Sequence, residues 1–223
     1  MKFEQCAKSF FLYRNFPFLR DKLPLERQLT FKRGHDVGTL AQGLIPGGTD
    51  VSKLCSNTSE ALVKTRELVE KACPVIYEAA FVHKSVLVIT DILCLDNGRY
   101  TAYEVKSSLK VSEIYLKDAY LQYYVLKNEL KGFDDLFLVT LDASYEFEDT
   151  LELRKLFKKR SVKEKAESNL AYFEHRTLEA AELIEANQIP DMPVGMHCFR
   201  PYTCDFFGTC WKGLQGKNSL FNL

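Results

Sequence analysis

The sequence predicts an α/β fold, in which a central mixed β-sheet is flanked by helices. Three β-rich runs, at residues 75–82, 86–95 and 100–107, follow one another with short connections, which indicates an antiparallel meander. A helical segment at 112–130 and an apolar run at 136–141 come next. This order of a meander, a helix and a further strand, with helices before and after it, predicts helices packed around one mixed sheet.

The remaining helices are expected before and after the meander. In the N-terminal segment, apolar residues recur at the i, i+3, i+4 spacing from Phe3 to Phe11, which predicts an amphipathic helix that ends before Pro17. Further helices are expected at 31–43, 59–72, 151–160 and 164–187.

Length and composition favour one folded domain spanning residues 1–223. A chain of 223 residues with 46% hydrophobic and 27% charged residues can bury a core of ordinary size. The formal net charge is zero, which argues against nucleic-acid binding by overall charge but leaves local basic patches open. No apolar run reaches the ~18 residues that cross a bilayer, and the N-terminal segment lacks the apolar core of a signal peptide. We therefore expect no membrane association and a cytoplasmic location.

Two carboxylates and a lysine are expected to meet on the meander. Asn97-Gly98 predicts a two-residue type I′ turn, so the numbers of cross-strand partners sum to 195. Asp91 then lies opposite Glu104, and Lys106 points to the same face of the sheet. Two facing carboxylates repel each other, and a divalent cation such as Mg²⁺ or Mn²⁺ would compensate them.

The same residues also have a plain structural interpretation. A Glu-x-Lys triplet is expected about once by chance in a chain of this size, and Glu129-Leu130-Lys131 is a second instance. A solvated ion pair across two strands is therefore the alternative to a catalytic site. Glu78, on the preceding strand, is a further acidic candidate.

The cysteines divide into two groups. Seven cysteines in a chain without an export signal argue against a disulfide framework. Cys198, Cys204 and Cys210 lie close together near the C-terminus with C-x5-C-x5-C spacing, whereas Cys55, Cys73 and Cys94 are scattered. The three C-terminal thiols need a fourth ligand to hold a metal, and either His197 or Cys6 could supply it, so zinc and iron–sulfur chemistry are both open.

Taken together, these motifs resemble the RecB-like branch of the PD-(D/E)XK nucleases. Asp91 and Glu104-Val105-Lys106 look like the D…(D/E)-x-K signature, although Thr90 replaces the proline of the PD pair. His35 matches the position of an additional metal-ligating histidine, and Gln122-Tyr123-Tyr124 is similar to the Gln/Tyr motif near the DNA.

The cysteines extend this resemblance. Cys6 with the C-terminal trio is similar to the cysteine clamp of the CRISPR-associated RecB-like exonucleases and of the AddB helicase–nuclease, which holds a 4Fe–4S cluster. The spacing departs from the usual pattern, in which two of the tail cysteines lie closer together.

The resemblance implies a restriction-endonuclease-like core with an N-/C-terminal cysteine cluster. It implies that Asp91, Glu104 and His35 hold Mg²⁺ or Mn²⁺, that Lys106 positions the attacking water, and that Gln122 holds DNA or the lysine. Cys6, Cys198, Cys204 and Cys210 would ligate a 4Fe–4S cluster, with Zn²⁺ as the alternative. The implied activity is exonucleolytic hydrolysis of single-stranded DNA or of single-stranded ends.

Partners and an alternative function complete the expectations. DNA is the expected partner, and a helicase or the CRISPR adaptation machinery is a candidate protein partner. The chain contains no phosphate-binding G-x-x-x-x-G-K-[ST] loop of its own. A basic run between Arg154 and Lys165 is either a solvated helix face or a contact for DNA phosphates. The alternative to a nuclease is a non-catalytic, metal-stapled DNA-binding or adaptor domain.

Overall fold

A computed structural model describes residues 2–186 and 188–212 of the chain. The chain divides into two compact units, of which one contains Met1–Gln28 and Arg176–Leu223 and the other Leu29–His175. In the described part of the chain, no helix is long and apolar enough to span a bilayer.

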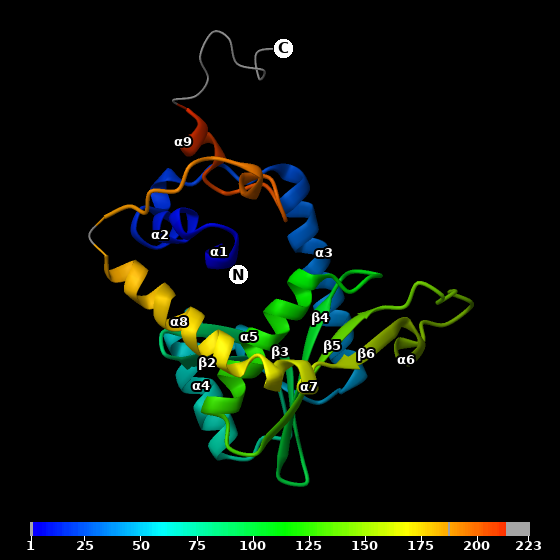
Figure 1. Cartoon of the computed structure of the whole chain (residues 1–223). Helices are drawn as coiled ribbons and strands as arrows, with labels where there is room; N and C mark the ends of the chain where they lie inside the picture. Colours follow the sequence, from blue (N-terminus) through cyan, green and yellow to red (C-terminus); the bar gives the residue numbers. More distant parts are fainter. Residues whose placement is uncertain (1, 187, 213–223) are drawn as a thin grey trace. The chain divides into compact units, whose positions relative to one another are not determined.

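The larger unit contains a six-stranded mixed sheet, and the α/β prediction is confirmed. The strands follow the order of the sequence: β1 Thr49–Asp50, β2 Val75–His83, β3 Val86–Asp96, β4 Arg99–Lys106, β5 Phe133–Leu141 and β6 Phe157–Ser161 (Figure 1). β2, β3 and β4 form the antiparallel meander, and β6 is antiparallel to β5. The β1–β2 and β4–β5 pairs are parallel.

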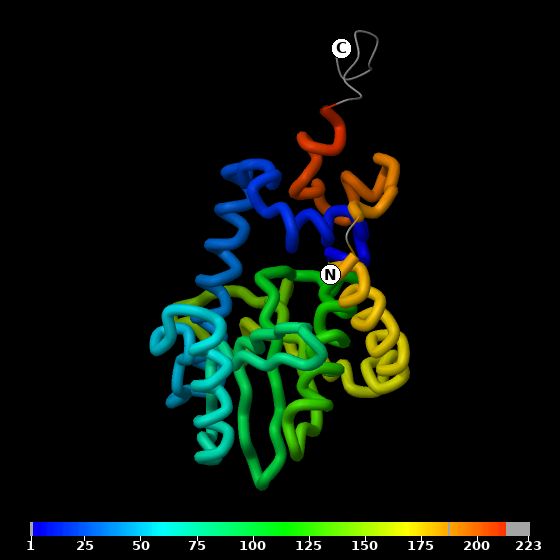
Figure 2. The backbone as a smooth tube through the Cα atoms, turned by 90° about the vertical axis from the view of Figure 1, so that its left-hand side faces the viewer, coloured from blue at the N-terminus to red at the C-terminus, as the bar shows by residue number. Residues whose placement is uncertain are grey.

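The β3–β4 hairpin has the register that its turn predicts. Asn97 and Gly98 both have positive φ, at 48° and 75°, as a type I′ turn requires. The Cα pairs run from Asp96↔Arg99 to Ile92↔Tyr103, so partner numbers sum to 195. The hairpin is the long green loop at the bottom of Figure 2. This register brings the strand positions of Asp91 and Glu104 to the same end of the hairpin.

Helices cover both faces of the sheet. Helix α5, Glu113–Glu129, begins at Ser112, whose hydroxyl caps the backbone N–H of Tyr115, and packs with α4, Thr58–Glu70, on the main core. On the other face, Val37, Leu40 and Ala41 of helix α3, Leu25–Ala41, pack against Val139 and its neighbours. The short elements of this unit are η2 Gln42–Leu44, η3 Val51–Lys53, α6 Leu153–Leu156 and α7 Lys163–Ser168.

The smaller unit combines N-terminal and C-terminal segments around its own apolar cluster. It contains α1 Lys2–Gln5, α2 Ala7–Asn15, η1 Pro17–Leu19, η4 Met196–Cys198 and α9 Phe207–Trp211, together with the end of α8, Leu170–Glu185. Leu12, Cys198, Cys204 and Phe206 form the buried cluster. The buried Asp205 carboxylate binds Lys2, Arg20 and Arg27, and these ion pairs link the two segments.

Three predicted helices differ from the observed elements. The segment 151–160 is not one helix, because α6 ends at Leu156 and β6 begins at Phe157, where the chain pairs with β5. The N-terminal helix breaks at Cys6, whose extended backbone and thiol cap α2. The segment 164–187 breaks at Asn169 between α7 and α8, and Asn187 lies outside the described residues.

Candidate active site

A polar pocket of ≈ 440 Å³ in the larger unit contains four of the five predicted catalytic and metal-binding residues. The meander contributes Glu78, Asp91, Glu104 and Lys106, and helix α3 contributes His35. The sheet therefore brings together residues that are up to 71 positions apart in the sequence, from His35 to Lys106. Gln122 does not line this pocket, although it is buried on α5.

Asp91 and Glu104 lie one position beyond the last pair of the β3–β4 ladder. The Oδ2 atom of Asp91 accepts a hydrogen bond from the backbone N–H of Val105 at 2.6 Å, which fixes this carboxylate against β4. The Glu104 side chain is buried, and its Oε1 accepts from Lys106 at 2.6 Å. Its Oε2 has no hydrogen-bond partner among the described residues. A buried carboxylate oxygen without a donor is costly unless another group binds it.

Glu78 has an unusual backbone that breaks the β2–β3 ladder beside Asp91. The pairs Tyr77↔Ile92 and Ala79↔Thr90 lie on either side of Glu78, whose φ is +54°. A non-glycine residue in this region costs about 1–3 kcal/mol, and such strain is concentrated at functional sites. The strained position places a third carboxylate in the pocket.

Lys106 is held between two carboxylates. Its Nζ donates to Glu104 Oε1 at 2.6 Å and to Asp118 Oδ2 at 2.8 Å. The ammonium group also lies 5.6 Å from the ring centroid of Tyr115, within cation–π range. Asp118 and Tyr115 are one turn apart on α5, so this helix sets the position of the lysine head group.

The electrostatics of the pocket favour binding of a cation. Burial, with the Asp91 charge as the next cause, raises the pKa of Glu104 to about 8. Burial also raises the pKa of Asp91 to about 6, against the Val105 hydrogen bond, and raises that of Glu78. For Lys106, burial opposes the charged form, but Glu104 and Asp118 outweigh it and raise the pKa. The pocket thus holds more carboxylates than its single lysine neutralises.

Two glycines on α3 keep the pocket open. Gly34 and Gly38 are one turn apart and line the pocket with His35. A Cβ at Gly38 would meet nothing within 4 Å, and one at Gly34 would only reach the Ser107 hydroxyl at 4.0 Å. The backbone of α3 can therefore be approached closely from the pocket.

Sequence reasoning missed two contributors to this site. Asp118, rather than Gln122, holds the Lys106 ammonium group, and the buried Oε1 of Gln122 has no hydrogen-bond partner in the described part of the chain. Asp118 lies four residues before Gln122 on the same helix, so the helical period was the available signal. Gly38 carried no signal, since a glycine in a helix shows its role only when its surroundings are known.

The acidic residues fit a hard divalent cation by their chemistry. Three carboxylates and an imidazole line one pocket, and Glu104 offers a buried oxygen without a donor. Oxygen donors of this kind suit Mg²⁺ or Mn²⁺. Within residues 2–186 and 188–212, no group of three or more His, Cys, Asp or Glu side chains is placed so that it could hold a metal ion.

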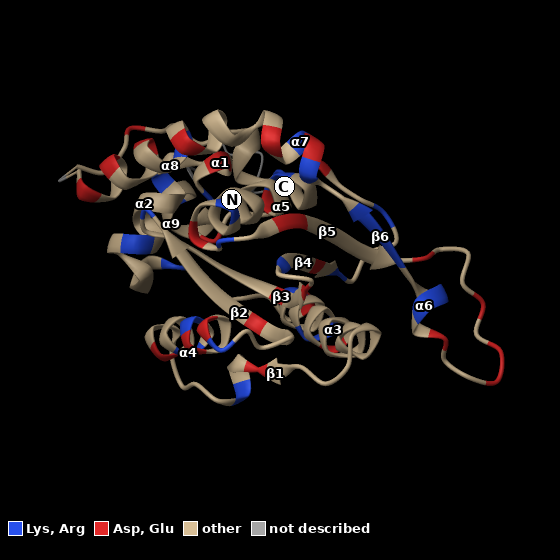
Figure 3. Cartoon of the chain, turned by 90° about the horizontal axis from the view of Figure 1, so that it is seen from below, with Lys and Arg blue, Asp and Glu red and all other residues tan. Residues whose placement is uncertain are grey.

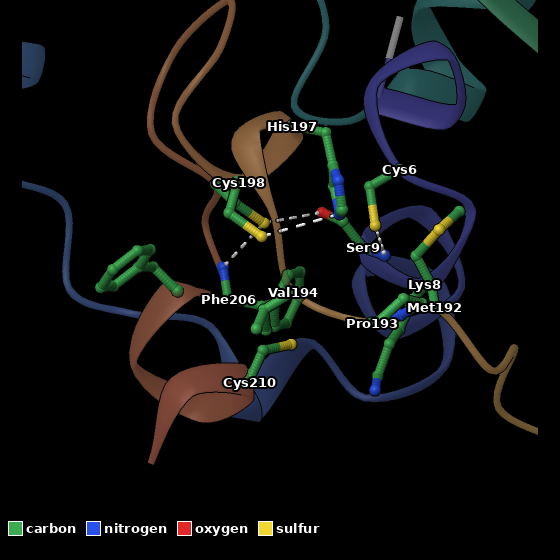
Figure 4. A pocket seen from close by; sticks show the side chains of 12 residues that line it. Cys6, Lys8, Ser9, Met192, Pro193, Val194, His197, Cys198, Phe206 and Cys210 are labelled. Carbon is green, nitrogen blue, oxygen red and sulfur yellow. Dashed lines mark hydrogen bonds between the residues drawn. The ribbon is translucent and has the colours of Figure 1, made fainter. Parts of the chain in front are cut away.

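The four predicted cluster cysteines come together in the smaller unit. Cys6, Cys198, Cys204 and Cys210 all line one cavity and are free thiols. Figure 4 shows the sulfur atoms of Cys6, Cys198 and Cys210 pointing into a common space, beside His197 and Ser9. Burial raises the pKa of Cys6 and of Cys210, and Cys198 and Cys204 add to both shifts.

The surroundings of these thiols are polar as well as apolar. The Cys204 thiol contacts the Ser9 hydroxyl at 3.4 Å, the Cys6 sulfur accepts from the Ser9 backbone N–H at 3.4 Å, and His197 Nε2 lies 3.6 Å from the Cys198 sulfur. Four thiols around one cavity have the donor chemistry of a Cys₄ zinc ion or iron–sulfur cluster.

Comparison with known protein families gives no match, and comparison with curated proteins gives none either.

Proposed function

We propose that the chain is a metal-dependent DNA nuclease of the RecB-like PD-(D/E)XK type, with a restriction-endonuclease-like core. The observation that carries the proposal is the buried Glu104 carboxylate, which has one oxygen on Lys106 and the other without a donor, next to Asp91. If these residues formed only a structural ion pair across two strands, nothing would explain why Glu104 is buried beside Asp91. Like charges at this spacing destabilise a sheet.

Each residue has a role in phosphodiester hydrolysis. Asp91, Glu104 and His35 would hold Mg²⁺ or Mn²⁺, and Glu78 is the further acidic candidate. When bound, the metal would supply Lewis-acid stabilisation of the phosphate charge and a more acidic water. Lys106, fixed by Asp118, orients the attacking water and offers positive charge to the phosphate oxygens.

The substrate is proposed to be single-stranded DNA or a single-stranded end, cut exonucleolytically. The polar pocket is open, and α3 presents glycines instead of bulky side chains beside it, which leaves room for a strand to approach the carboxylates. A helicase or the CRISPR adaptation machinery would supply such ends.

The cysteine group is proposed to hold a 4Fe–4S cluster, with Zn²⁺ as the alternative. Its role would be structural, since it would tie α2 to the C-terminal segment of the smaller unit.

A cleavage assay tests the nuclease. Protein purified without oxygen is incubated with end-labelled single-stranded DNA and Mg²⁺, Mn²⁺ or EDTA. We expect cleavage that requires the metal and is lost in Glu104→Gln and in Lys106→Ala. The second Glu-x-Lys triplet supplies the matched controls Glu129→Gln and Lys131→Ala, which should cleave like the wild type.

Two outcomes would contradict the proposal. Cleavage that survives both pocket substitutions would place the activity elsewhere or in a contaminant. DNA binding without any cleavage, unchanged by the pocket substitutions, would favour the metal-stapled adaptor domain.

A further inference from the structure

A second pocket of the larger unit has a volume of ≈ 420 Å³ and combines apolar walls with two cations. We call it the β6 pocket. It is lined by Leu44, Ile45, Ile92, Tyr103, Val139, Arg154, Phe157 and Lys159. Pockets that bind small molecules have this size and this mixture of apolar surface and few polar groups.

The β6 pocket is separate from the candidate active site. Ile92 and Tyr103 are a cross-strand pair, and each is the immediate neighbour in sequence of one acidic residue, Asp91 or Glu104. Successive side chains of a strand point to opposite faces, and the two pockets share no lining residue. The β6 pocket therefore needs its own explanation.

Tyr103 and Phe157 give the pocket aromatic walls. The Tyr103 ring stacks on Phe137 with a centroid separation of 5.6 Å and an interplanar angle of 20°. Lys159 lies 5.5 Å from the Phe137 ring centroid. The buried side chains of Ile92 and Val139 line the pocket together with Tyr103, so a flat ring could bind against apolar side chains.

Its two cations, Arg154 and Lys159, have no acidic partner in the part of the chain that the structure describes. Figure 3 shows basic residues on β6 and α6, and acidic residues along the loop before α6. Lys155 and Lys158 pair with Glu152 and Asp142. Within residues 2–186 and 188–212, neither Arg154 nor Lys159 forms an ion pair. A guanidinium group and an ammonium group at one pocket suit a phosphate.

We propose that the β6 pocket binds a nucleoside monophosphate, with its base against Tyr103 and its phosphate at Arg154 and Lys159. The flat apolar surface accounts for the base. The two cations, which form no ion pair among the described residues, account for the charge. The proposal does not depend on nuclease activity, because no residue of the candidate active site takes part.

Calorimetric titration with thymidine monophosphate in EDTA tests this site, with thymidine and inorganic phosphate as separate ligands. We expect the monophosphate to bind more tightly than either fragment. The double variant Arg154→Ala/Lys159→Ala should bind it at least about tenfold more weakly, through loss of charge-assisted hydrogen bonds. Tyr103→Leu keeps apolar volume but removes the ring, and should also weaken binding.

Lys158→Ala is the matched control, because Lys158 is on the same strand but points to the other face and pairs with Asp142. It should bind as the wild type does, and so should Glu104→Gln. No binding of the monophosphate at millimolar concentration would overturn the proposal. An equal loss of monophosphate binding in Lys158→Ala would show that only the general positive charge of β6 attracts the ligand. A loss of binding in Glu104→Gln would show that the ligand binds in the candidate active site instead.

Discussion

Glu104→Gln should abolish stabilisation of the protein by Mg²⁺ without unfolding the chain. The wild-type carboxylate is buried, near Asp91, with one oxygen lacking a donor. Glutamine keeps the volume and an acceptor for Lys106, which also retains Asp118 at 2.8 Å. In EDTA, we therefore expect the variant to melt no lower than the wild type.

The size of the lost stabilisation follows from mass action. At a Mg²⁺ concentration a hundredfold above its Kd, binding to the folded state alone adds about 2.7 kcal/mol to the free energy of unfolding. For a chain of this length, that corresponds to a rise in Tm of about 5–11 °C. The wild type and the control Glu129→Gln should show this rise in a thermal melt, and Glu104→Gln should show none.

The pH dependence in EDTA has a definite sign. The pKa of Glu104 is raised from 4.5 to about 8 by burial first and by Asp91 second, so the folded state holds the proton more tightly than the unfolded state does. Wild-type stability should therefore fall relative to Glu104→Gln as the pH rises from about 4.5 to 8.

The Mg²⁺ prediction has its own refuting outcomes. A Glu104→Gln variant that still shows the Mg²⁺-dependent rise in Tm, or that melts far below the wild type in EDTA, would refute the reasoning.

Three further predictions concern other parts of the molecule. Asp118→Asn should lower the cleavage rate about ten- to a hundredfold by releasing Lys106, while the affinity for DNA stays unchanged. Asp118→Glu should recover part of the rate. A fall in DNA affinity without a fall in rate would contradict this positioning role. Gly38→Ala should stabilise α3 by about 0.5–1 kcal/mol, measured by chemical denaturation. Gly38→Leu should block cleavage because its side chain would occupy the pocket. Full activity of the leucine variant would show that the substrate does not pass there. Cys198→Ser, purified without oxygen, should contain less iron or zinc by elemental analysis and should melt at a lower temperature than the wild type. Cys94→Ser should retain the metal. Equal metal content in the two variants would exclude the cysteine group as the metal site.

The sheet register could be predicted because a local signal determines it. Asn-Gly needs two positive φ angles, and the alternation of side chains then fixes every pair of the hairpin. The position of Asp91 relative to Glu104 followed from that arithmetic. The ligand and catalytic roles of these residues, of His35 and of Gln122 stay predictions.

The strand β6 could not be predicted because its residues favour a helix on their own. Lysine and arginine, which make up three of its five residues, are good helix formers, and the pairing of Phe157–Ser161 with β5 exists only in the folded chain. The left-handed backbone of Glu78 is likewise invisible in sequence, since nothing about a glutamate in an apolar run predicts positive φ.

The composition of β6 has a consequence for the behaviour of the protein at high concentration. β6 is the last strand in the order of the sheet, and its Lys158, Lys159 and Arg160 side chains are exposed. An edge strand presents unpaired backbone groups that can recruit a strand from another molecule, and clustered positive charges oppose that approach. Replacing these residues with threonine or valine would turn the edge into a template for intermolecular β-aggregation.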